Sequence, residues 1–331
     1  MLLYIGIDEA GYGPMLGPLC VGVAAMRLER WKPDDGVPDL WSHLKAAVCK
    51  SPRDSKARLA VADSKKLCKP MAHGAGRLAE AERSVLGFVQ AMTGAMPRSD
   101  RDLFEALAVT PGSLDWYAGE PTPCPAHADA AEAAIAANAL CVTLKHAGVG
   151  VDLLRVARTD EARFNAMVAG GRSKANTTLS AIAEHAPHII KLIENAIDEN
   201  GRGASEVHTR IVIDRQGGRT RYEAALSHVF GRPLRTLAEA AEASTYEFAD
   251  LPNARIRVQA KAEDGHFPVA LASMQAKLVR ELSMERFNAF WSQRRAGVKP
   301  TAGYTTDARR WLADMDGALS DQELRSLIRL A

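Results

Sequence analysis

Two adjacent acidic residues near the N-terminus, Asp8 and Glu9, are the first residues whose types suggest chemistry. They close the apolar run 2–8 and are followed at once by the segment 11–14, Gly-Tyr-Gly-Pro. Neighbouring side chains of a strand point to opposite faces, so both carboxylates can serve one site only if the strand bends or ends there. Glycine and proline permit such a change of direction. The alternative interpretation is an ordinary acidic turn.

Two later segments supply further carboxylates. Asp214 follows the β-branched run 209–213, and strand ends are where α/β folds commonly place their sites. An aspartate after a strand also forms turns, which is the alternative for this residue. Glu281 and Glu285 are spaced i, i+4 on an expected helix and therefore share one face. Glu285 precedes Arg286 and is expected in a surface pair, whereas Glu281 follows an apolar stretch and is expected to point inward.

These carboxylates indicate a hard divalent cation. Three or four oxygen ligands of this type suit Mg²⁺ or Mn²⁺ rather than zinc. The five cysteines lie far apart, include no C-x-x-C pair and are odd in number. This pattern argues against a zinc site and against a disulfide framework, so a reducing cytoplasm is the expected location.

The composition is that of an ordinary globular protein. Of the 331 residues, 47% are hydrophobic and 25% are charged. With 42 Lys+Arg against 40 Asp+Glu the formal net charge is only +2, so overall charge indicates no polyanionic partner. The N-terminus has no basic n-region, and no apolar run approaches the roughly 18 residues that a membrane span needs. We therefore expect neither secretion nor membrane insertion.

The elements that must position the acidic residues alternate along the chain. Apolar and β-branched runs predict strands over 2–8, 19–26, 151–158 and 209–213. Helical spacing of apolar residues predicts helices over 75–92, 130–147, 176–200 and 268–291, and from residue 307 onward. Proline and glycine predict a loop-rich segment over 93–129 and a loop over 296–306. This order favours an α/β fold with a mixed or parallel sheet.

Several motifs occur in an order that resembles ribonuclease HII, the type 2 ribonuclease H family. Its opening Asp-Glu-Ala-Gly-Arg-Gly-Pro is similar to residues 8–14, and a second Gly-Pro follows at 17–18. Its Asp-Ser-Lys-Lys-Leu is similar to residues 63–67, and its Ala-Ser-Ile-x-Ala-Lys helix to residues 272–277. Its Gly-Tyr-Gly-Thr loop is similar to the segment from Gly303, and residues 161–165 are a weaker match to another motif. The resemblance extends over about residues 4 to 312, in separate short segments.

The resemblance implies a ribonuclease H-like fold, with a mixed central sheet flanked by helices, and two-metal hydrolysis of a phosphodiester. The four metal positions would be Asp8, Glu9, Asp214 and Glu281, with Mg²⁺ or Mn²⁺ as cofactor. The implied activity is that of an endonuclease on the RNA strand of RNA/DNA hybrids or on ribonucleotides embedded in DNA. A monomeric, cytoplasmic enzyme is expected, with nucleic acid as its partner.

The resemblance also implies a set of substrate-binding residues: Gly11, Tyr12, Gly13, Ser64, Lys65, Lys66 and Tyr304. His266 is a further candidate, for contact to phosphate or for proton transfer, and Lys277 is a further candidate site residue. Each has a structural alternative: a surface basic pair for the two adjacent lysines, simple packing for the tyrosine loop, and a structural role for the histidine. Residues 277–310 contain eight basic against three acidic residues, which suits a duplex backbone or, alternatively, a solvated helix face.

Three features depart from the family pattern. Tyr12 occupies the position where the family has Arg or Lys, which places recognition of the ribonucleotide junction in question. Glu281 replaces the usual Asp and reaches one methylene farther. The chain is longer than a typical member, and we expect a single domain with insertions at 93–129 and 166–210 and a C-terminal helical extension over 282–331. A nuclease with a changed substrate and a non-catalytic nucleic-acid-binding module are the alternatives.

Overall fold

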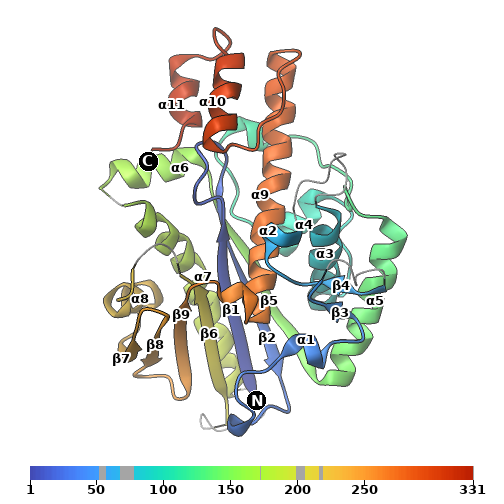
Figure 1. The fold of residues 1–331 in the computed structure, drawn as a ribbon, viewed down its shortest axis with the longest axis vertical. Helices are drawn as coiled ribbons and strands as arrows, with labels where there is room; N and C mark the ends of the chain where they lie inside the picture. Colours follow the sequence, from blue (N-terminus) through green and yellow to red (C-terminus); the bar gives the residue numbers. More distant parts are fainter. Residues whose placement is uncertain (52–56, 68–77, 172, 199–205, 216–218, 331) are drawn as a thin grey trace.

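A seven-stranded sheet forms the centre of the protein (Figure 1). The computed structural model describes residues 1–51, 57–67, 78–171, 173–198, 206–215 and 219–330. In the order β5-β2-β1-β6-β9-β8-β7, the strands span Val149–Thr159, Leu19–Leu28, Leu2–Ala10, His208–Asp214, Ala254–Gln259, Ala243–Phe248 and Leu234–Glu239. A two-stranded parallel sheet pairs β3 (Val48–Cys49) with β4 (Leu59–Ala60).

The strand directions make the central sheet mixed. Strand β1 pairs antiparallel with β2 and parallel with β6, and β6 pairs parallel with β9. The predicted strands are β1, β2, β5 and β6, and the predicted mixed sheet flanked by helices is confirmed. Strands β7, β8 and β9 were not predicted, because each has only six residues and each carries charged residues at positions that are not buried, such as Arg235, Glu247 and Arg255.

Alternation of side chains along β1 builds a hydrophobic core on each face of the sheet. Leu2 and Tyr4 join one core, whereas Leu3, Ile5 and Ile7 join the other. This is the period of two that a strand imposes. Asp8 therefore continues the face of Leu2 and Tyr4, and the sheet is buried on both sides at this strand.

Helix α9 (Phe267–Arg294) covers the face that carries Asp8 and extends beyond the sheet to the C-terminal helices (Figure 1). Glycines allow the two to meet backbone to backbone: a Cβ at Gly6 would lie 2.1 Å from the Val269 nitrogen, and one at Gly22 would lie 2.3 Å from the Ala272 oxygen. Helices α3 (Ala79–Thr93) and α5 (Ala130–Ala147) join the same core. The predicted helix 75–92 corresponds to α3, and its residues 75–77 lie outside the described ones.

Helix α7 (Lys174–Asp198) covers the opposite face together with α8 (Glu223–Phe230). Buried Ile182, Ile189 and Ile193 place its apolar stripe against the sheet, as the sequence pattern predicted. Helix α6 (Glu161–Ala169) precedes it. The segment 166–210 thus supplies a whole layer of the fold, while its status as an insertion stays a prediction. Its predicted end at residues 199–201 lies outside the described residues.

The segment 93–129 contains more regular structure than the predicted loop. Helix α4 (Asp100–Ala106) and a 3-10 turn (Asp115–Tyr117) interrupt it. The Ser99 hydroxyl caps α4 by accepting a hydrogen bond from the Asp102 amide. The buried Asp100 carboxylate accepts hydrogen bonds from the amide and from the hydroxyl of Thr122. The prolines and glycines that predicted a loop flank this short helix.

The C-terminal part forms a third, aromatic-rich cluster at the end of α9 farthest from the N-terminus (Figure 1). Helix α10 (Thr305–Asp314) brings Trp311 against Trp291 and Phe287 of α9. Helix α11 (Asp321–Leu327) adds Leu327 to the same cluster. The remaining short elements are α1 (Leu40–His43), α2 (Ser64–Leu67) and the 3-10 turns Pro33–Asp35 and Ala262–Asp264. Among the described residues, no helix is both long and apolar enough to cross a membrane.

Candidate active site

Asp8, Glu9 and Asp214 form one cluster of carboxylates. Each offers a ligand atom, and these atoms lie within 4.8 Å of one another. The parallel pairing of β1 with β6 brings Ile7 beside Ile213, so the following acidic residues meet at the same edge of the sheet. The sequence prediction that two strand ends deliver carboxylates to one place is therefore met for these three residues.

Crowding and burial make the charged forms of these carboxylates costly. Burial, followed by the charges of Glu9 and Asp214, raises the pKa of Asp8 well above its usual value. Burial and then the charge of Glu9 likewise raise the pKa of Asp214, although the Ala262 amide donates to its Oδ1 at 2.8 Å. Repulsion of this kind is offset when a cation binds between the oxygens. The arrangement has the chemistry of a hard-metal site.

Glu263 is a further carboxylate beside Asp214, outside the group of three whose ligand atoms lie within 4.8 Å of one another, and sequence analysis did not select it. It lies in the 3-10 turn between β9 and α9, is 9% exposed, and its Oε2 has no hydrogen-bond partner among the described residues. Burial and then the charge of Asp214 raise its pKa. The signal that would have found it is the strand end: β9 is parallel to β6, so the turn after Gln259 lies beside Asp214. That strand was not predicted.

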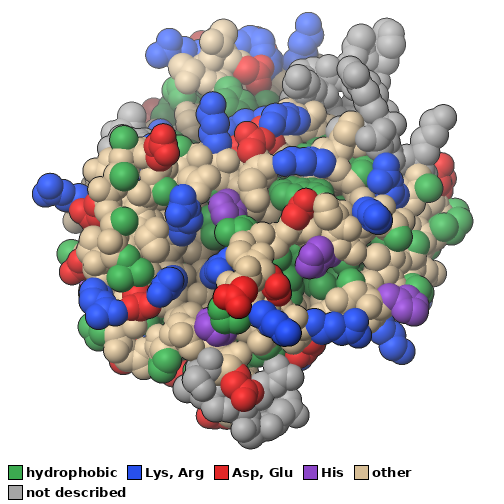
Figure 2. Space-filling model, turned by 60° about the horizontal axis from the view of Figure 1, so that its bottom comes forward, with side chains coloured by type: hydrophobic (Ala, Val, Ile, Leu, Met, Phe, Trp, Pro, Cys, Tyr) green, Lys and Arg blue, Asp and Glu red, His purple; other side chains and the backbone are tan. Residues whose placement is uncertain are grey.

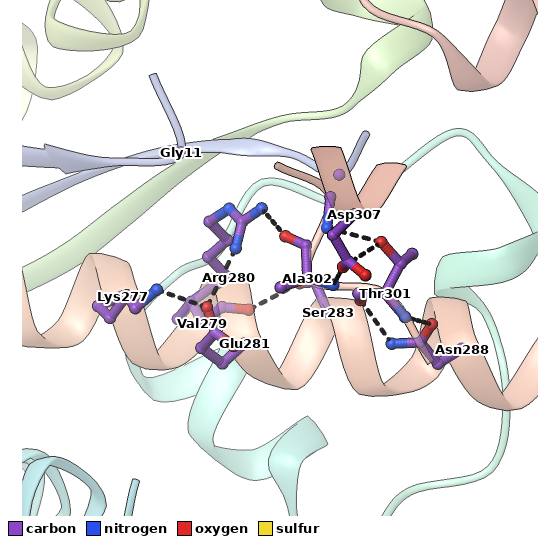
Figure 3. Close-up of polar contacts among 12 residues, drawn as sticks. Gly11, Lys277, Val279, Arg280, Glu281, Ser283, Asn288, Thr301, Ala302 and Asp307 are labelled. Carbon is purple, nitrogen blue, oxygen red and sulfur yellow. Dashed lines mark hydrogen bonds and ion pairs between the residues drawn. The ribbon is translucent and has the colours of Figure 1, made fainter. Parts of the chain in front are cut away.

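Glu281 lies elsewhere on α9 and is not part of the cluster found among the described residues. Its Oε1 accepts from Lys277 Nζ at 2.6 Å and from Arg280 Nη1 at 3.0 Å (Figure 3). Both cations come from its own helix, so the carboxylate neutralises the basic side chains beside it. The inward position expected for Glu281 is met in part, and its role as a metal ligand stays a prediction.

The basic segment 63–67 reaches the cluster through α2. Ser64 Oγ lies 3.0 Å from Ser273 Oγ of α9, and Ser273 in turn hydrogen-bonds Asp8. Although partial burial opposes the charge of Lys65, the carboxylates of Asp63, Asp8, Glu263 and Glu9 raise its pKa. Lys65 therefore lies in the field of the cluster. Lys66 is turned outward, with its Nζ 2.5 Å from Asp264 Oδ1.

Residues 11–17, which we call the glycine turn, lead directly from β1. Gly11 has a φ of +86°, and a Cβ there would lie 2.5 Å from the Pro18 oxygen, so only glycine fits this bend. The amides of Met15 and Leu16 both donate to the Gly303 carbonyl, at 2.9 and 3.1 Å. The predicted tyrosine loop is therefore docked on the glycine turn, although almost 300 residues separate them in sequence.

Arg280 of α9 lies beneath both the glycine turn and the tyrosine loop and contacts each of them. It is fully buried, its Nη2 donates to the Ala302 carbonyl at 2.8 Å, and Figure 3 shows it between Gly11 and that loop. Its guanidinium carbon lies 5.4 Å from the centre of the Tyr304 ring, and Tyr304 is 48% exposed. The ring thus has a cation on one side and is open to a ligand, which suits stacking on a sugar or base.

Tyr12 is uncharged, but a basic side chain lies beside it: that of Lys174, the first residue of α7. Its Nζ lies 5.4 Å from the centre of the Tyr12 ring. Burial and then the charge of Arg329 lower its pKa. Sequence analysis did not select this lysine, because nothing local to residue 174 indicates that α7 begins beside the glycine turn.

His266 has a structural environment. Its Nδ1 lies 2.5 Å from the hydroxyl of Tyr4, its side chain is buried at the start of α9, and burial lowers its pKa to about 4. The imidazole is therefore neutral at physiological pH. The suggested role in phosphate contact or proton transfer stays a prediction.

The basic excess over 277–310 is largely neutralised within the protein. Arg286 pairs with Asp100, Arg294 with Glu323, and Arg310 with Asp307 and Asp314. On the face that Figure 2 presents, Lys and Arg are likewise interspersed with Asp and Glu. The segment does not present its positive charges as one unpaired field, so the interpretation as a duplex-binding stretch loses its main support.

By sequence, the chain matches no protein-family model and no curated protein. Among solved structures it is similar to ribonuclease HII in its complex with PCNA from Archaeoglobus fulgidus, with 15% identity and a TM-score of 0.45 over 99% of this chain and 94% of that one. It is also similar to ribonuclease H2 from Pyrococcus horikoshii OT3, with 14% identity and a TM-score of 0.43 over 94% and 85% of the two chains.

A third similar structure is Bst-RNase HIII in complex with Mn²⁺, with 16% identity and a TM-score of 0.40 over 99% of this chain and 66% of that one. All three TM-scores are below 0.5. The arrangement of this chain's own residues is therefore what bears on its function.

Proposed function

We propose that this protein is a divalent-metal-dependent endonuclease that hydrolyses the RNA strand of RNA/DNA hybrids or ribonucleotides embedded in DNA. The observation that carries this proposal is the cluster of Asp8, Glu9 and Asp214, whose ligand atoms lie within 4.8 Å of one another. It stands at the start of a glycine turn that hydrogen-bonds Gly303, the residue before the exposed Tyr304. A carboxylate cluster beside a surface suited to sugar and phosphate favours phosphodiester hydrolysis.

The donor set fits Mg²⁺ or Mn²⁺. Only carboxylate oxygens converge, their pKa values are raised, and the buried Oε2 of Glu263 lacks a partner in the described part of the chain. We assign Asp8, Glu9, Asp214 and Glu263 as the residues that would hold the metal, in preference to the ion-paired Glu281. Divalent cations bound there would activate water and stabilise the departing 3′ oxygen.

The surrounding residues would bind and orient the nucleic acid. Lys65, in the field of the carboxylates, would contact a phosphate next to the scissile bond. The glycine turn would approach the strand with its backbone, since a Cβ at Gly13 would meet nothing within 4 Å. Tyr304 would stack on a sugar or base, and Ser64 and Ser273 would hold Asp8 in place.

Cleavage of two labelled duplexes tests the proposal. One is an RNA/DNA hybrid and the other is DNA with a single ribonucleotide, each incubated with Mg²⁺, Mn²⁺ or a chelator. The Asp8→Asn variant is the matched control, because the amide keeps the shape of the carboxylate but removes its charge. We expect metal-dependent cutting at ribonucleotides by the wild type and none by the variant.

Other outcomes would select the alternatives. Cleavage of the hybrid alone would indicate that Tyr12 has removed a junction determinant. Metal-dependent cleavage without any preference for ribonucleotides would indicate a changed substrate, and salt-sensitive binding without cleavage would indicate a non-catalytic module. Equal cleavage by Asp8→Asn and wild type would contradict the assigned metal site.

A further inference from the structure

The C-terminal segment returns to the glycine turn and binds it from the inside. Arg329 is 5% exposed and its guanidinium donates to two carbonyls at the start of the turn: Nη1 to Gly11 at 2.6 Å and Nη2 to Tyr12 at 3.0 Å. Nη1 also lies 3.4 Å from the Gly17 oxygen, and the Arg329 amide donates to the Met15 carbonyl at 2.9 Å. One residue thus engages the turn at four carbonyls.

The segment that carries Arg329 is itself held firmly. The guanidinium carbon lies 4.2 Å from the centre of the buried Phe164 ring. Asn165 Nδ2 donates to the Ile328 carbonyl at 2.8 Å, and its Oδ1 accepts from the Leu330 amide at 2.8 Å. Helix α6 therefore clamps the residues on both sides of Arg329 and fixes where its guanidinium lies.

Fixing these carbonyls also fixes the amides of the same peptide units. In a trans peptide the C=O and N–H point to opposite sides, and neither the Gly11-Tyr12 nor the Tyr12-Gly13 bond is cis. The N–H groups of Tyr12 and Gly13 therefore point away from Arg329. Neither has a hydrogen-bond acceptor in the described ranges, and Gly13 is exposed. Consecutive free amides in a turn are donors suited to an anionic or sugar oxygen.

We propose that Arg329 is a positioning residue of the candidate active site: by holding the carbonyls of Gly11 and Tyr12, it presents the amides of Tyr12 and Gly13 to an oxygen of the bound strand. This inference rests on the proposed function. It places a residue at the very end of the described chain in the machinery that orients the substrate. Arg329 acts through the turn and does not itself touch the substrate.

Steady-state cleavage of the ribonucleotide-containing duplex, together with Mn²⁺ titration of the free protein, tests this role. We expect Arg329→Met to raise KM by about tenfold or more, because charge-assisted hydrogen bonds that order the turn are lost. The change in kcat should be smaller, and Mn²⁺ affinity should stay within about twofold, since none of the assigned carboxylates belongs to the glycine turn. Arg325→Met is the matched control: Arg325 is an exposed arginine of the same segment, and this variant should behave as the wild type.

A second variant keeps the test decisive if Arg329→Met does not fold. Arg329→Lys retains the charge, but a single ammonium cannot reproduce the fork that reaches two peptide carbonyls, so its KM should also rise. A folded variant at position 329 with the KM of the wild type overturns the inference. So does a loss of Mn²⁺ binding in step with KM, which would indicate a merely structural role. A wild-type protein that cleaves neither duplex overturns the proposed function and this inference with it.

Discussion

Five acidic side chains are candidate metal ligands, and their immediate partners distinguish them. Asp8, Glu9 and Asp214 face one another, and Glu263 joins them from the turn before α9 with one buried oxygen unpaired among the described residues. Glu281 instead accepts from two cations of its own helix. The environment of a carboxylate, rather than its spacing in sequence, decides whether it is available to a cation.

Substitution of the two glutamates separates these assignments. Glu263→Gln is expected to lower kcat/KM at least about 100-fold, because loss of a ligand should exceed the 10- to 100-fold cost typical of outer partners. Glu281→Gln should cost less than about tenfold, since under this assignment it removes a partner of Lys277 and Arg280 and no metal ligand. The measurement is steady-state cleavage with Mn²⁺ titration in parallel. The reverse ranking would restore Glu281 as the fourth ligand.

A second prediction at the residue scale concerns Lys174. The ammonium of Lys174 lies over the Tyr12 ring. If it contacts a phosphate, Lys174→Met should make the association constant for nucleic acid less sensitive to salt: the magnitude of the slope of its logarithm against the logarithm of salt concentration should fall by about one. Binding is measured by fluorescence anisotropy in the Asp8→Asn background, which prevents cleavage. Lys191→Met, at an exposed position of the same helix, is the control and should leave the salt dependence unchanged. An unchanged slope at position 174 would exclude the contact.

At the scale of elements, the position of the site depends on how closely α9 lies on the sheet. Gly6 of β1 and Gly22 of β2 face the first turns of α9, where any Cβ would overlap backbone atoms. This contact places Ser273 within reach of Asp8 and the 3-10 turn of Glu263 beside Asp214. Two residues without side chains thus set the distance between the sheet, which carries Asp8, Glu9 and Asp214, and α9, which carries Ser273.

Gly6→Ala is therefore expected to destabilise the fold by about 1–3 kcal/mol or more, as overpacking does, because the Val269 nitrogen would lie 2.1 Å from the new Cβ. Denaturant unfolding of the metal-free protein gives the free energy. Gly265→Ala is the control, since a Cβ there would meet nothing within 4 Å and its φ is negative. Equal stability of the two variants would show that α9 can shift without cost.

At the scale of the whole molecule, the cluster couples stability to pH and to metal. The pKa values of Asp8, Asp214 and Glu263 are raised in the folded protein, mainly by burial and by mutual charge. A carboxyl with a raised pKa contributes stability that is fully present below its unfolded pKa and is lost as pH rises through the folded value. The metal-free protein should therefore lose stability from acidic toward neutral pH, where a divalent cation would restore it.

The rise in melting temperature on addition of Mn²⁺ is expected to be larger at pH 8 than at pH 5, because metal and protons compete for the same oxygens. At 100 times the dissociation constant, binding to one site stabilises the fold by about 2.7 kcal/mol. Thermal scans at both pH values provide the measurement. Asp8→Asn should melt at a higher temperature than the metal-free wild type at pH 8 and respond little to Mn²⁺. A metal response independent of pH would argue against the cluster as the binding site.

The sequence by itself determined the elements with strong local patterns and the residues attached to their ends. The apolar run before Asp8, the β-branched run before Asp214 and the long helix from about residue 268 each carry their signal within a few residues. The prediction of a mixed α/β sheet with carboxylates at strand ends followed from these patterns. Short strands with charged outer faces carry a weaker local signal, and β7, β8 and β9 were missed for that reason.

Only the tertiary structure decided which distant residues meet. The parallel pairing of β6 with β9 brings Glu263 to Asp214, and the path of the C-terminal segment brings Arg329 to Gly11 across more than 300 residues. In the same packing, most of the basic residues of α9 and α10 form ion pairs with acidic residues of the chain. These contacts depend on strand register and on backbone approach, which residues far apart in sequence set jointly and no single segment encodes.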